Sequence, residues 1–594
     1  MSDSVVRGTG WSARPRHGNV GVRWLPIVVV GLLAACRSSD SGTGPVDAIG
    51  VGQQLSASGT SDLTLQGGAS GADYVLVAYN SSPNGDSFAS ASITGTGIAT
   101  APSASLMADR TPSSNLSTFQ GGNPASPRLD EQFHIRLAQR VHAAGRQRMA
   151  AARAWFNARQ TAATTTRSGF RIAPSYSAIP ATVAVGQVVT LNVNADSVCN
   201  DPIYHGFIVK AVGSKSIVLA DTLNPTGGFT DADYQRFATR FDNLVWPLDT
   251  QNFGVPSDID GNGRVAILFT RAVNELTPAN SESFVGGFFF ARDLFPATNS
   301  SATLEACPAS NEGEMFYMLV PDPNGTINGN VRRTGFVDSL TTGVLAHEFQ
   351  HLINASRRLY VNTAAIDFEE VVWLNEGLSH IAEELLYYQE SGMSPRNNLS
   401  DADIRVNSRA TYPFWKADAS ANFSRFIDYL QDPAGNSPAA GNDSLATRGA
   451  TWSFLRYSVD QVSTDEAATW RAYDNSIDTG RKTINFALQT DPLPLFKSWA
   501  LANYLDDTGY TTDPVYSHKS WNFRNIYSNT YVSLGGYPLT VNSLVDNTPS
   551  SARVRGLSAA YYRLSVPAGQ SAHLSFSTTG TAGASLNFIA VRTR

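Results

Sequence analysis

The chain has few charged residues, and this shortage narrows the classes of protein that it fits. Asp, Glu, Lys and Arg make up 16% of its 594 residues, and the formal net charge is -6. The sequence contains no basic run and no interleaving of aromatic with basic residues, so we expect no nucleic-acid partner. Gly, Ser, Thr, Asn and Pro are frequent instead, a composition typical of exported proteins rich in turns and strands.

The N-terminal apolar run is too short for a membrane span. "LPIVVVGLLAAC" follows four arginines between residues 7 and 23 and holds about a dozen apolar residues, where a spanning helix needs roughly 20. This pattern predicts an export signal over residues 1–35. The stretch ending in Cys36 resembles the bacterial lipobox. This resemblance implies that Cys36 is lipidated and that the lipid anchors the protein to the bacterial cell envelope, with the outer membrane as the expected site. The alternative is an ordinary signal peptide and a secreted protein.

Cysteine is scarce as well, with three residues in the chain. If Cys36 is lipidated, Cys199 and Cys307 remain in an oxidising compartment, where they can form one disulfide. Two buried free thiols are the alternative.

The alternation of apolar and polar residues predicts an α+β protein with small β domains at both ends. Strong helix formers at helical spacing indicate a helix before the central domain, and its His134 and His142 are interpreted as solvated or packing residues. The expected parts are a signal peptide at 1–35, a small β domain at 37–99, a flexible linker at 100–127, a helical segment at 128–165, a central domain at 178–540 and a C-terminal β domain at 541–594.

The stretch "DIDGNGRV" is similar to the first half of a calcium loop. Asp258, Asp260 and Asn262 occupy ligand positions, but Phe269 stands where a bidentate Glu is expected. We interpret the stretch as a turn whose Asp and Asn side chains cap backbone groups, with a structural Ca²⁺ site as the weaker alternative.

The stretch "LAHEFQHLIN" carries the residues of a zinc helix. At about 100° per residue, His347, Glu348 and His351 fall within an arc of roughly 100°, and the apolar side chains occupy the opposite arc. Two histidines four residues apart can bind one metal ion, and the adjacent Glu can act as a base. The pattern therefore predicts a metal site on one face of a helix.

A third protein ligand is needed, because catalytic zinc takes three protein groups and keeps one position open. "VVWLNEGLSHIAEELLYY" offers Glu376, with His380 and Glu383 on the same helical face. Glu370 is the competing ligand, but it points away from that face if the helix extends so far.

"HEFQH" followed by "WLNEG" resembles the gluzincin metallopeptidases, and the two motifs together are most similar to the hyicolysin-like secreted bacterial metallopeptidases. The resemblance covers about residues 180 to 540, with its specific motifs between 345 and 388, and implies a gluzincin-type domain. It makes Zn²⁺ the cofactor and Glu348 the general base that activates the zinc-bound water. The residues it implies at the site are the ligands His347, His351 and Glu376 and the supporting groups Asn375, His380 and Glu383.

The sequence departs from the family pattern in two places. The gap from His351 to Glu376 is longer than in the aminopeptidase-N and thermolysin branches, and His380 stands where thermolysin-like enzymes have an Asp, so His380 could itself be a ligand. No motif identifies the group that stabilises the oxyanion, for which the candidates by position are Tyr412, Tyr429 and Tyr457.

These observations favour a lipid-anchored zinc endopeptidase that hydrolyses proteins or peptides outside the cytoplasm. "VGGFFFARD" has no Glu after its glycines, so the exopeptidase motif of the aminopeptidase branch is missing. One alternative is a surface binding or adhesion protein with a non-catalytic peptidase-like domain, against which the intact Glu348 argues. Another is a zinc hydrolase of non-peptide amides. The membrane is expected as a partner only through the lipid, and the residues leave the oligomeric state open.

Overall fold

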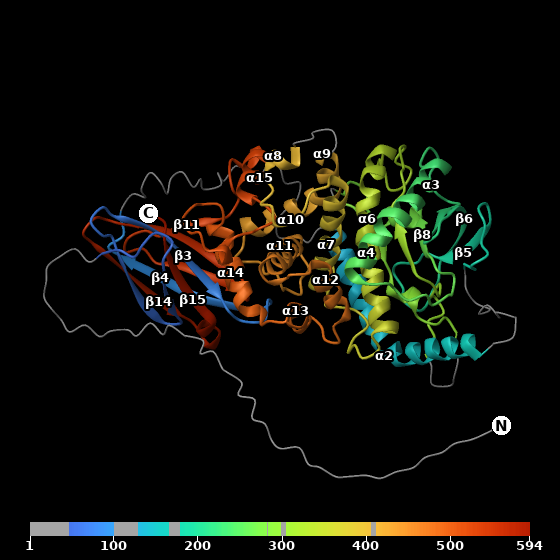
Figure 1. Ribbon diagram of the computed structural model, residues 1–594, viewed down its shortest axis with the longest axis horizontal. Coiled ribbons are helices and arrows are strands. Elements are labelled where there is room, and N and C mark those ends of the chain that lie inside the picture. Colours follow the sequence, from blue (N-terminus) through green and yellow to red (C-terminus); the bar gives the residue numbers. More distant parts are fainter. Residues whose placement is uncertain (1–46, 100–128, 166–178, 282, 299–304, 406–410) are drawn as a thin grey trace, which may run out of the picture. The chain divides into compact units, whose positions relative to one another are not determined.

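The computed structural model describes most of one compact unit of the chain, Pro45–Arg594 (Figure 1). The expected export signal, Cys36 and the expected linker lie outside the described residues. None of the helices within the described part of the chain is long and apolar enough to cross a membrane. The described residues form a mixed α+β structure and comprise 47–99, 129–165, 179–281, 283–298, 305–405 and 411–594.

A six-stranded mixed sheet, in the order β5-β6-β7-β8-β10-β9, carries the first half of the central domain. β7, β8 and β10 pair in parallel and are buried along their whole length, as strands with both faces covered must be. β9 pairs antiparallel with β10 at the sheet edge. The strands span Val188–Asn192 (β5), Tyr204–Val212 (β6), Ser216–Asp221 (β7), Val265–Phe269 (β8), Gly287–Phe289 (β9) and Met315–Met318 (β10).

Aromatic side chains fix the first helices against this sheet. Phe237 of α3 stacks on Phe269 of β8 with ring centroids 5.2 Å apart. Phe241 meets Phe349 of α6 edge to face at 5.0 Å, so the apolar arc of α6 turns toward the sheet. These helices span Asp231–Arg240 (α3), Trp246–Phe253 (α4), Arg271–Glu275 (α5) and Thr334–Ser356 (α6).

Helix α7 lies between α6 and α11. Gly377 allows the close approach to α11, because a Cβ at this position would stand 2.5 Å from Cγ2 of Thr451. The helices of this half span Val372–Ser391 (α7), Asp401–Arg405 (α8), Thr411–Phe414 (α9), Ser420–Gln431 (α10), Leu445–Val462 (α11), Glu466–Asn475 (α12), Arg481–Leu488 (α13), Pro492–Leu505 (α14) and Phe523–Asn529 (α15).

Helix α2, Leu129–Thr165, forms where the sequence predicts the helical segment. Its apolar side chains are buried against the central domain, among them Phe133, Leu137, Val141 and Ala152.

A β-sandwich contains the strands from both ends of the described chain. One sheet has the order β1-β15-β3-β13-β11 and the other β12-β4-β14-β2. The rings of Phe576 and Phe588 stack at 3.8 Å in the sandwich core. The strands span Gln54–Ser58 (β1), Ser61–Gln66 (β2), Ala72–Asn80 (β3), Phe88–Thr96 (β4), Val541–Ser543 (β11), Ser550–Arg555 (β12), Ala559–Val566 (β13), Ser571–Thr578 (β14) and Leu586–Arg592 (β15).

This pairing corrects the expectation of two separate small β domains at 37–99 and 541–594. All nine residues of β3 are buried, so this strand needs a neighbour on each edge and cover on both faces. Both neighbours, β13 and β15, come from the C-terminal segment and pair antiparallel with it. The two segments therefore complete each other's hydrogen bonds.

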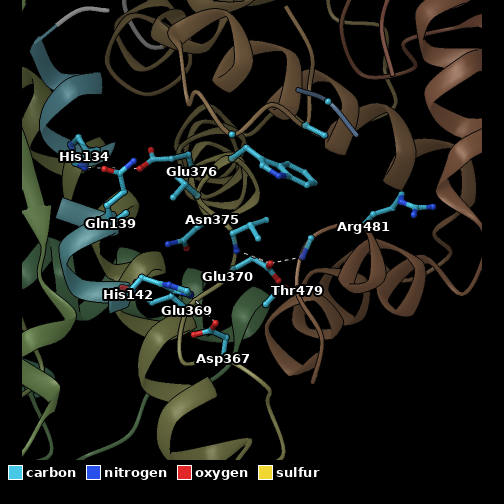
Figure 2. A pocket seen from close by; sticks show the side chains of 18 of the residues that line it. His134, Gln139, His142, Asp367, Glu369, Glu370, Asn375, Glu376, Thr479 and Arg481 are labelled. Carbon is cyan, nitrogen blue, oxygen red and sulfur yellow. Dashed lines mark hydrogen bonds and ion pairs between the residues drawn. The ribbon is translucent and has the colours of Figure 1, made fainter. Parts of the chain in front are cut away.

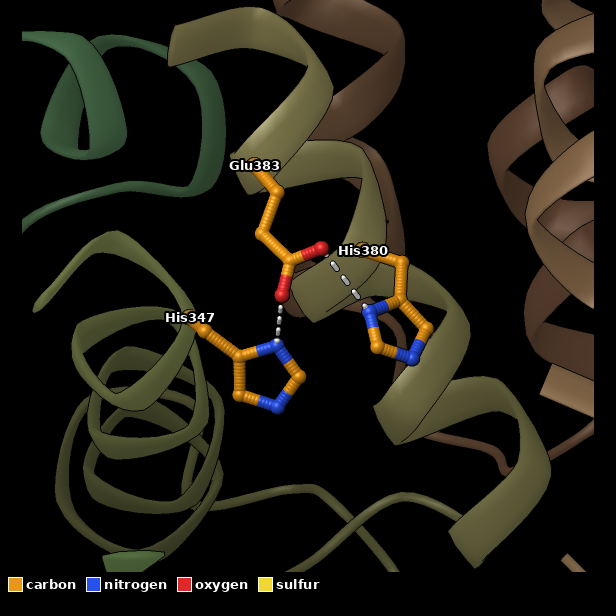
Figure 3. A group of neighbouring side chains, drawn as sticks. All are labelled: His347, His380 and Glu383. Carbon is orange, nitrogen blue, oxygen red and sulfur yellow. Dashed lines mark hydrogen bonds and ion pairs between the residues drawn. The ribbon is translucent and has the colours of Figure 1, made fainter. Parts of the chain in front are cut away.

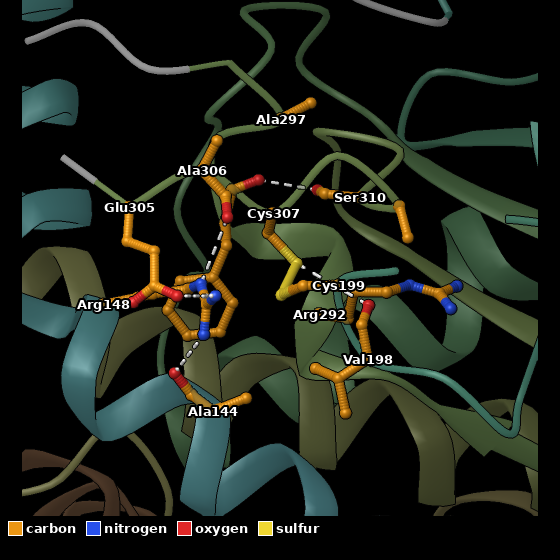
Figure 4. Close-up of a disulfide and its surroundings, with 12 residues drawn as sticks. Ala144, Arg148, Val198, Cys199, Arg292, Ala297, Glu305, Ala306, Cys307 and Ser310 are labelled. Atoms are coloured by element: carbon orange, nitrogen blue, oxygen red, sulfur yellow. Dashed lines mark hydrogen bonds and ion pairs between the residues drawn. A yellow bond between two sulfur atoms is a disulfide. The ribbon is translucent and has the colours of Figure 1, made fainter. Parts of the chain in front are cut away.

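A disulfide joins Cys199 to Cys307, the two cysteines that the sequence left open as a bridge or as free thiols (Figure 4). It ties residues 108 positions apart, and Cys307 is fully buried. Closing so long a loop removes conformational freedom from the unfolded chain.

Replacing both cysteines, as Cys199→Ser with Cys307→Ser, should lower the free energy of unfolding by roughly 2–4 kcal/mol through that loop entropy. Thermal unfolding followed by circular dichroism, with and without reductant, checks this. Reductant should lower the melting temperature of the wild type and leave the double variant unchanged. Equal melting temperatures in all four samples would contradict a stabilising bridge.

Candidate metal centre

Helices α6 and α7 bring three metal-binding side chains together. The Nε2 atoms of His347 and His351 lie 3.2 Å apart, and the Glu376 carboxylate is 3.6 Å from the first and 3.7 Å from the second. All three side chains are buried. The structure thus groups the two histidines of the first motif with the carboxylate of the second.

The spacing of these atoms fits a zinc ion. Zinc bonds of about 2.0–2.2 Å in a tetrahedral site separate two ligand atoms by about 3.3–3.6 Å. The observed separations of 3.2 to 3.7 Å bracket that range.

A hydrogen bond at the far nitrogen orients the imidazole of His347. Its Nδ1 lies 2.9 Å from Oε1 of Glu383, which accepts only, so this nitrogen carries the proton. Nε2 of His347 then faces Nε2 of His351 and the Glu376 carboxylate. Oγ of Ser379 lies 3.1 Å from Nδ1 and 3.3 Å from Nε2 of His351, so it contacts the edge of this second ring.

Glu383 also contacts His380. Figure 3 shows the Glu383 carboxylate between the rings of His347 and His380, and its Oε2 lies 3.2 Å from Nδ1 of His380. Burial, together with nearby Arg425, lowers the pKa of His380 to about 3, so its ring is neutral. These three residues form a second candidate metal group, which shares His347 with the first.

Arg448 of α11 keeps the Glu376 carboxylate ionised. Its Nη1 lies 2.9 Å from Oε2 of Glu376, and its Nη2 lies 2.6 Å from Asp443. Burial alone would raise the pKa of Glu376, but Arg448 and His347 outweigh it and hold that pKa well below its usual range. The residue is therefore an anionic donor, as a metal requires.

Glu348 lies beside the cluster with the pKa of a base. Its Oε2 accepts a hydrogen bond of 2.8 Å from the backbone N–H of Phe289, in edge strand β9. Burial raises the pKa of Glu348 to about 7, with His347 opposing the rise and Glu376 adding to it. A carboxylate with this pKa can take and return a proton near neutral pH.

Glu370, the alternative third ligand, does not belong to the group of His347, His351 and Glu376. Its carboxylate accepts hydrogen bonds from the backbone of Gly480 and from Thr483. Asn375 stands next to Glu376 and lines a cavity of about 560 Å³, with its Oδ1 buried and unpaired among the described residues.

Three tyrosines are candidates for stabilising the oxyanion, and the hydroxyl groups of two of them form hydrogen bonds with other residues. Tyr429 bonds to Ser558 of the β-sandwich at 2.7 Å, and Tyr457 donates to the Val515 carbonyl at 2.6 Å. Tyr412 stacks on Trp415 with centroids 5.7 Å apart.

The calcium-like stretch forms the hydrogen bonds of a turn. Asp260 accepts from the backbone N–H of Asn262, and Asp258 accepts from that of Gly263. Oδ1 of Asn262, the atom that would bind a cation, accepts a hydrogen bond of 2.7 Å from the backbone N–H of Arg264. Asp258 and Asp260 lie close to a further carboxylate, that of Glu314.

His134 and His142 are interpreted from the sequence as solvated or packing residues, but each lies near an acidic side chain that this interpretation does not include. Nδ1 of His134 lies 3.9 Å from Oε1 of Glu376, and His142 pairs with Asp367 at 2.8 Å (Figure 2). Sequence reasoning also missed Arg448 and Ser379. The contacts of His134, His142 and Arg448 join segments more than 70 residues apart, which local spacing cannot reveal. Ser379 lies on the polar arc of α7, so its helical position could have identified it.

The chain matches no protein-family model. Over 231 residues it is 29% identical to the neutral metalloprotease ShpI of Staphylococcus hyicus. The match covers 36% of this chain and 48% of ShpI, so the chain spans about half the length of this relative. The similarity is modest and supports the metallopeptidase resemblance without reaching its subclass.

Glu376→Gln and Glu370→Gln form a matched pair that tests the ligand set. The first removes the anionic donor and should lower zinc affinity by at least about 10-fold. The second changes a carboxylate that lies outside the cluster and should leave zinc affinity unchanged. Competition with a chromophoric chelator measures both affinities. A loss confined to Glu370→Gln would assign the third ligand to that residue.

Proposed function

We propose that this protein is an exported zinc-dependent endopeptidase that hydrolyses peptide bonds in proteins or peptides. The observation that carries the proposal is the convergence of His347, His351 and Glu376 within 3.2 to 3.7 Å, with Glu348 beside them. The similarity to ShpI supports it. The gluzincin assignment of residues 178–540 belongs to the same proposal.

The chain's own residues supply the acid–base chemistry. When bound, Zn²⁺ polarises the scissile carbonyl and lowers the pKa of a coordinated water. Glu348 accepts the proton of the attacking water and delivers it to the leaving amine, while the Phe289 N–H holds the carboxylate in place. Glu383 and Ser379 keep the two imidazoles oriented.

We propose that an extended substrate pairs with the outer edge of β9, a strand whose three residues are buried in the described structure. It is the last strand of its sheet, and Phe289 at its end contacts the base. A peptide that adds to a sheet edge is held by backbone hydrogen bonds and is not recognised by its terminus. This favours cleavage within a chain, as proposed.

A surface binding protein with a non-catalytic domain is the competing function. Such a protein needs no base, whereas Glu348 is buried, hydrogen-bonded and has its pKa raised to about 7.

Glu348→Gln separates the two functions, because glutamine keeps the shape of the side chain and cannot take the proton. Casein cleavage should fall by about 10²–10⁴-fold while zinc is retained. Cleavage by the wild type should also stop after chelation and return with Zn²⁺. Glu384→Gln is the control. Glu384 also lies on α7, but its side chain points away from the cluster and contacts Trp521, so this variant should stay active. Zinc binding without cleavage in the wild type would favour the binding protein.

The proposed location is the cell envelope, through lipid on Cys36. Cys36→Ser removes the thiol that carries the lipid, so the protein should move from the membrane fraction to the soluble exported fraction. Fractionation of bacteria that express the two forms measures this. A wild type found entirely in the medium would instead indicate a secreted protein.

A further inference from the structure

The cavity beside the metal centre is large enough to receive a substrate side chain. Its volume is about 560 Å³, within the range of about 300–1,000 Å³ that binding sites for small molecules have. Phe289 of β9, His351 and Glu376 line its part next to the metal centre. A side chain of a substrate bound along β9 can therefore enter the cavity from the metal centre.

Carboxylates gather in the wall of this cavity, and most of them have partners within the protein. Hydrogen bonds or ion pairs to other described residues hold those of Asp86, Asp367, Glu370 and Glu376. The carboxylate of Glu369, in the segment that leads into α7, has no such partner among the described residues. Arg481 also lines the cavity, but Figure 2 shows its side chain pointing away from Glu369.

A carboxylate in this position is costly for the protein, because it loses water and gains no donor in exchange. Burial, and secondly the nearby Asp367, raise the pKa of Glu369 to about 8, and Arg358 lowers it only in part. Oδ1 of Asn375, in the same cavity wall, is a second acceptor that is buried without a donor among the described residues. A ligand that satisfies both groups has to donate hydrogen bonds, and a positive charge on it would stabilise the ionised Glu369.

We propose that the cavity is a subsite for a positively charged group of the substrate, an ammonium or a guanidinium, and that Glu369 is the residue that recognises it. The inference deepens the proposed function and rests on it. The charged group donates hydrogen bonds to the Glu369 carboxylate and to Oδ1 of Asn375. Trp373 and Val371 line the same cavity and offer apolar surface to the aliphatic part of a Lys or Arg side chain.

Digestion of a peptide library tests the subsite. The wild type cuts the library, and mass spectrometry gives the residues found at each position around the cut bonds. We expect Lys and Arg to be enriched roughly 10-fold or more at one position, because a hydrogen bond between charged groups contributes that much to binding. The charge could instead come from the free N-terminus of a peptide. In that case the cuts should cluster near the N-termini and disappear once the library is acetylated there.

Variants of Glu369 assign the preference to this residue. Glu369→Gln keeps the size of the side chain and removes its charge, so the preference should disappear. Glu369→Lys should replace it by a preference for Asp and Glu, which a merely structural role would not produce. Asp86→Asn is the matched control and should retain the preference, because Asp86 lines the same cavity but accepts a hydrogen bond from the backbone N–H of Gly441. A wild type that shows no preference for positive groups, or a preference that survives in Glu369→Gln, would overturn the proposal.

Failure of the proposed function is distinguishable from failure of this inference. Fluorescence anisotropy measures the binding of labelled peptides with Lys or norleucine, and with free or acetylated N-termini, to Glu348→Gln and to Glu348→Gln with Glu369→Gln. Tighter binding of the positive peptides that depends on Glu369, together with no cleavage by the wild type, would support the subsite and refute the peptidase. Cleavage without any preference would refute the subsite and leave the peptidase intact. Neither cleavage nor preference would overturn both.

Discussion

The buried ion pair between Arg448 and Glu376 is the interaction on which the metal centre depends. A carboxylate enclosed by protein is costly unless a positive charge compensates it, and Arg448 does so at 2.9 Å while Asp443 holds the other side of the guanidinium. Arg448 reaches the carboxylate because α11 packs closely on α7, which Gly377 permits. The charge of Glu376, one of the proposed ligands, is thus set by the packing of two helices.

The geometry of the centre reduces to the placement of α6 against α7. Helix α6 supplies two imidazoles and the proposed base Glu348, and α7 supplies the carboxylate together with Ser379 and Glu383, which contact the two rings. The sheet holds α6 through Phe349, and α11 holds α7.

Much of this centre could be predicted from the residues. Helical periodicity placed His347, Glu348 and His351 on one face and selected Glu376 over Glu370, because each choice depends on neighbours within a turn or two. The same reasoning failed for the β strands, which it assigned to two domains. Alternation shows that a strand such as β3 is buried but cannot name the strand beside it.

The sequence by itself determined which potential metal-binding side chains α6 and α7 carry, since residue type and helical spacing are local properties. Only the tertiary structure decided which charge stabilises Glu376, which strands complete the sandwich, and that His134 lies beside the metal ligands. The ion pair of Glu376 with Arg448, its contact with His134 and the pairing of β3 with β13 each join residues at least about 70 positions apart in the chain. Such contacts arise from the folding of the whole chain, in which burial and pairing are satisfied together, and no local pattern encodes them.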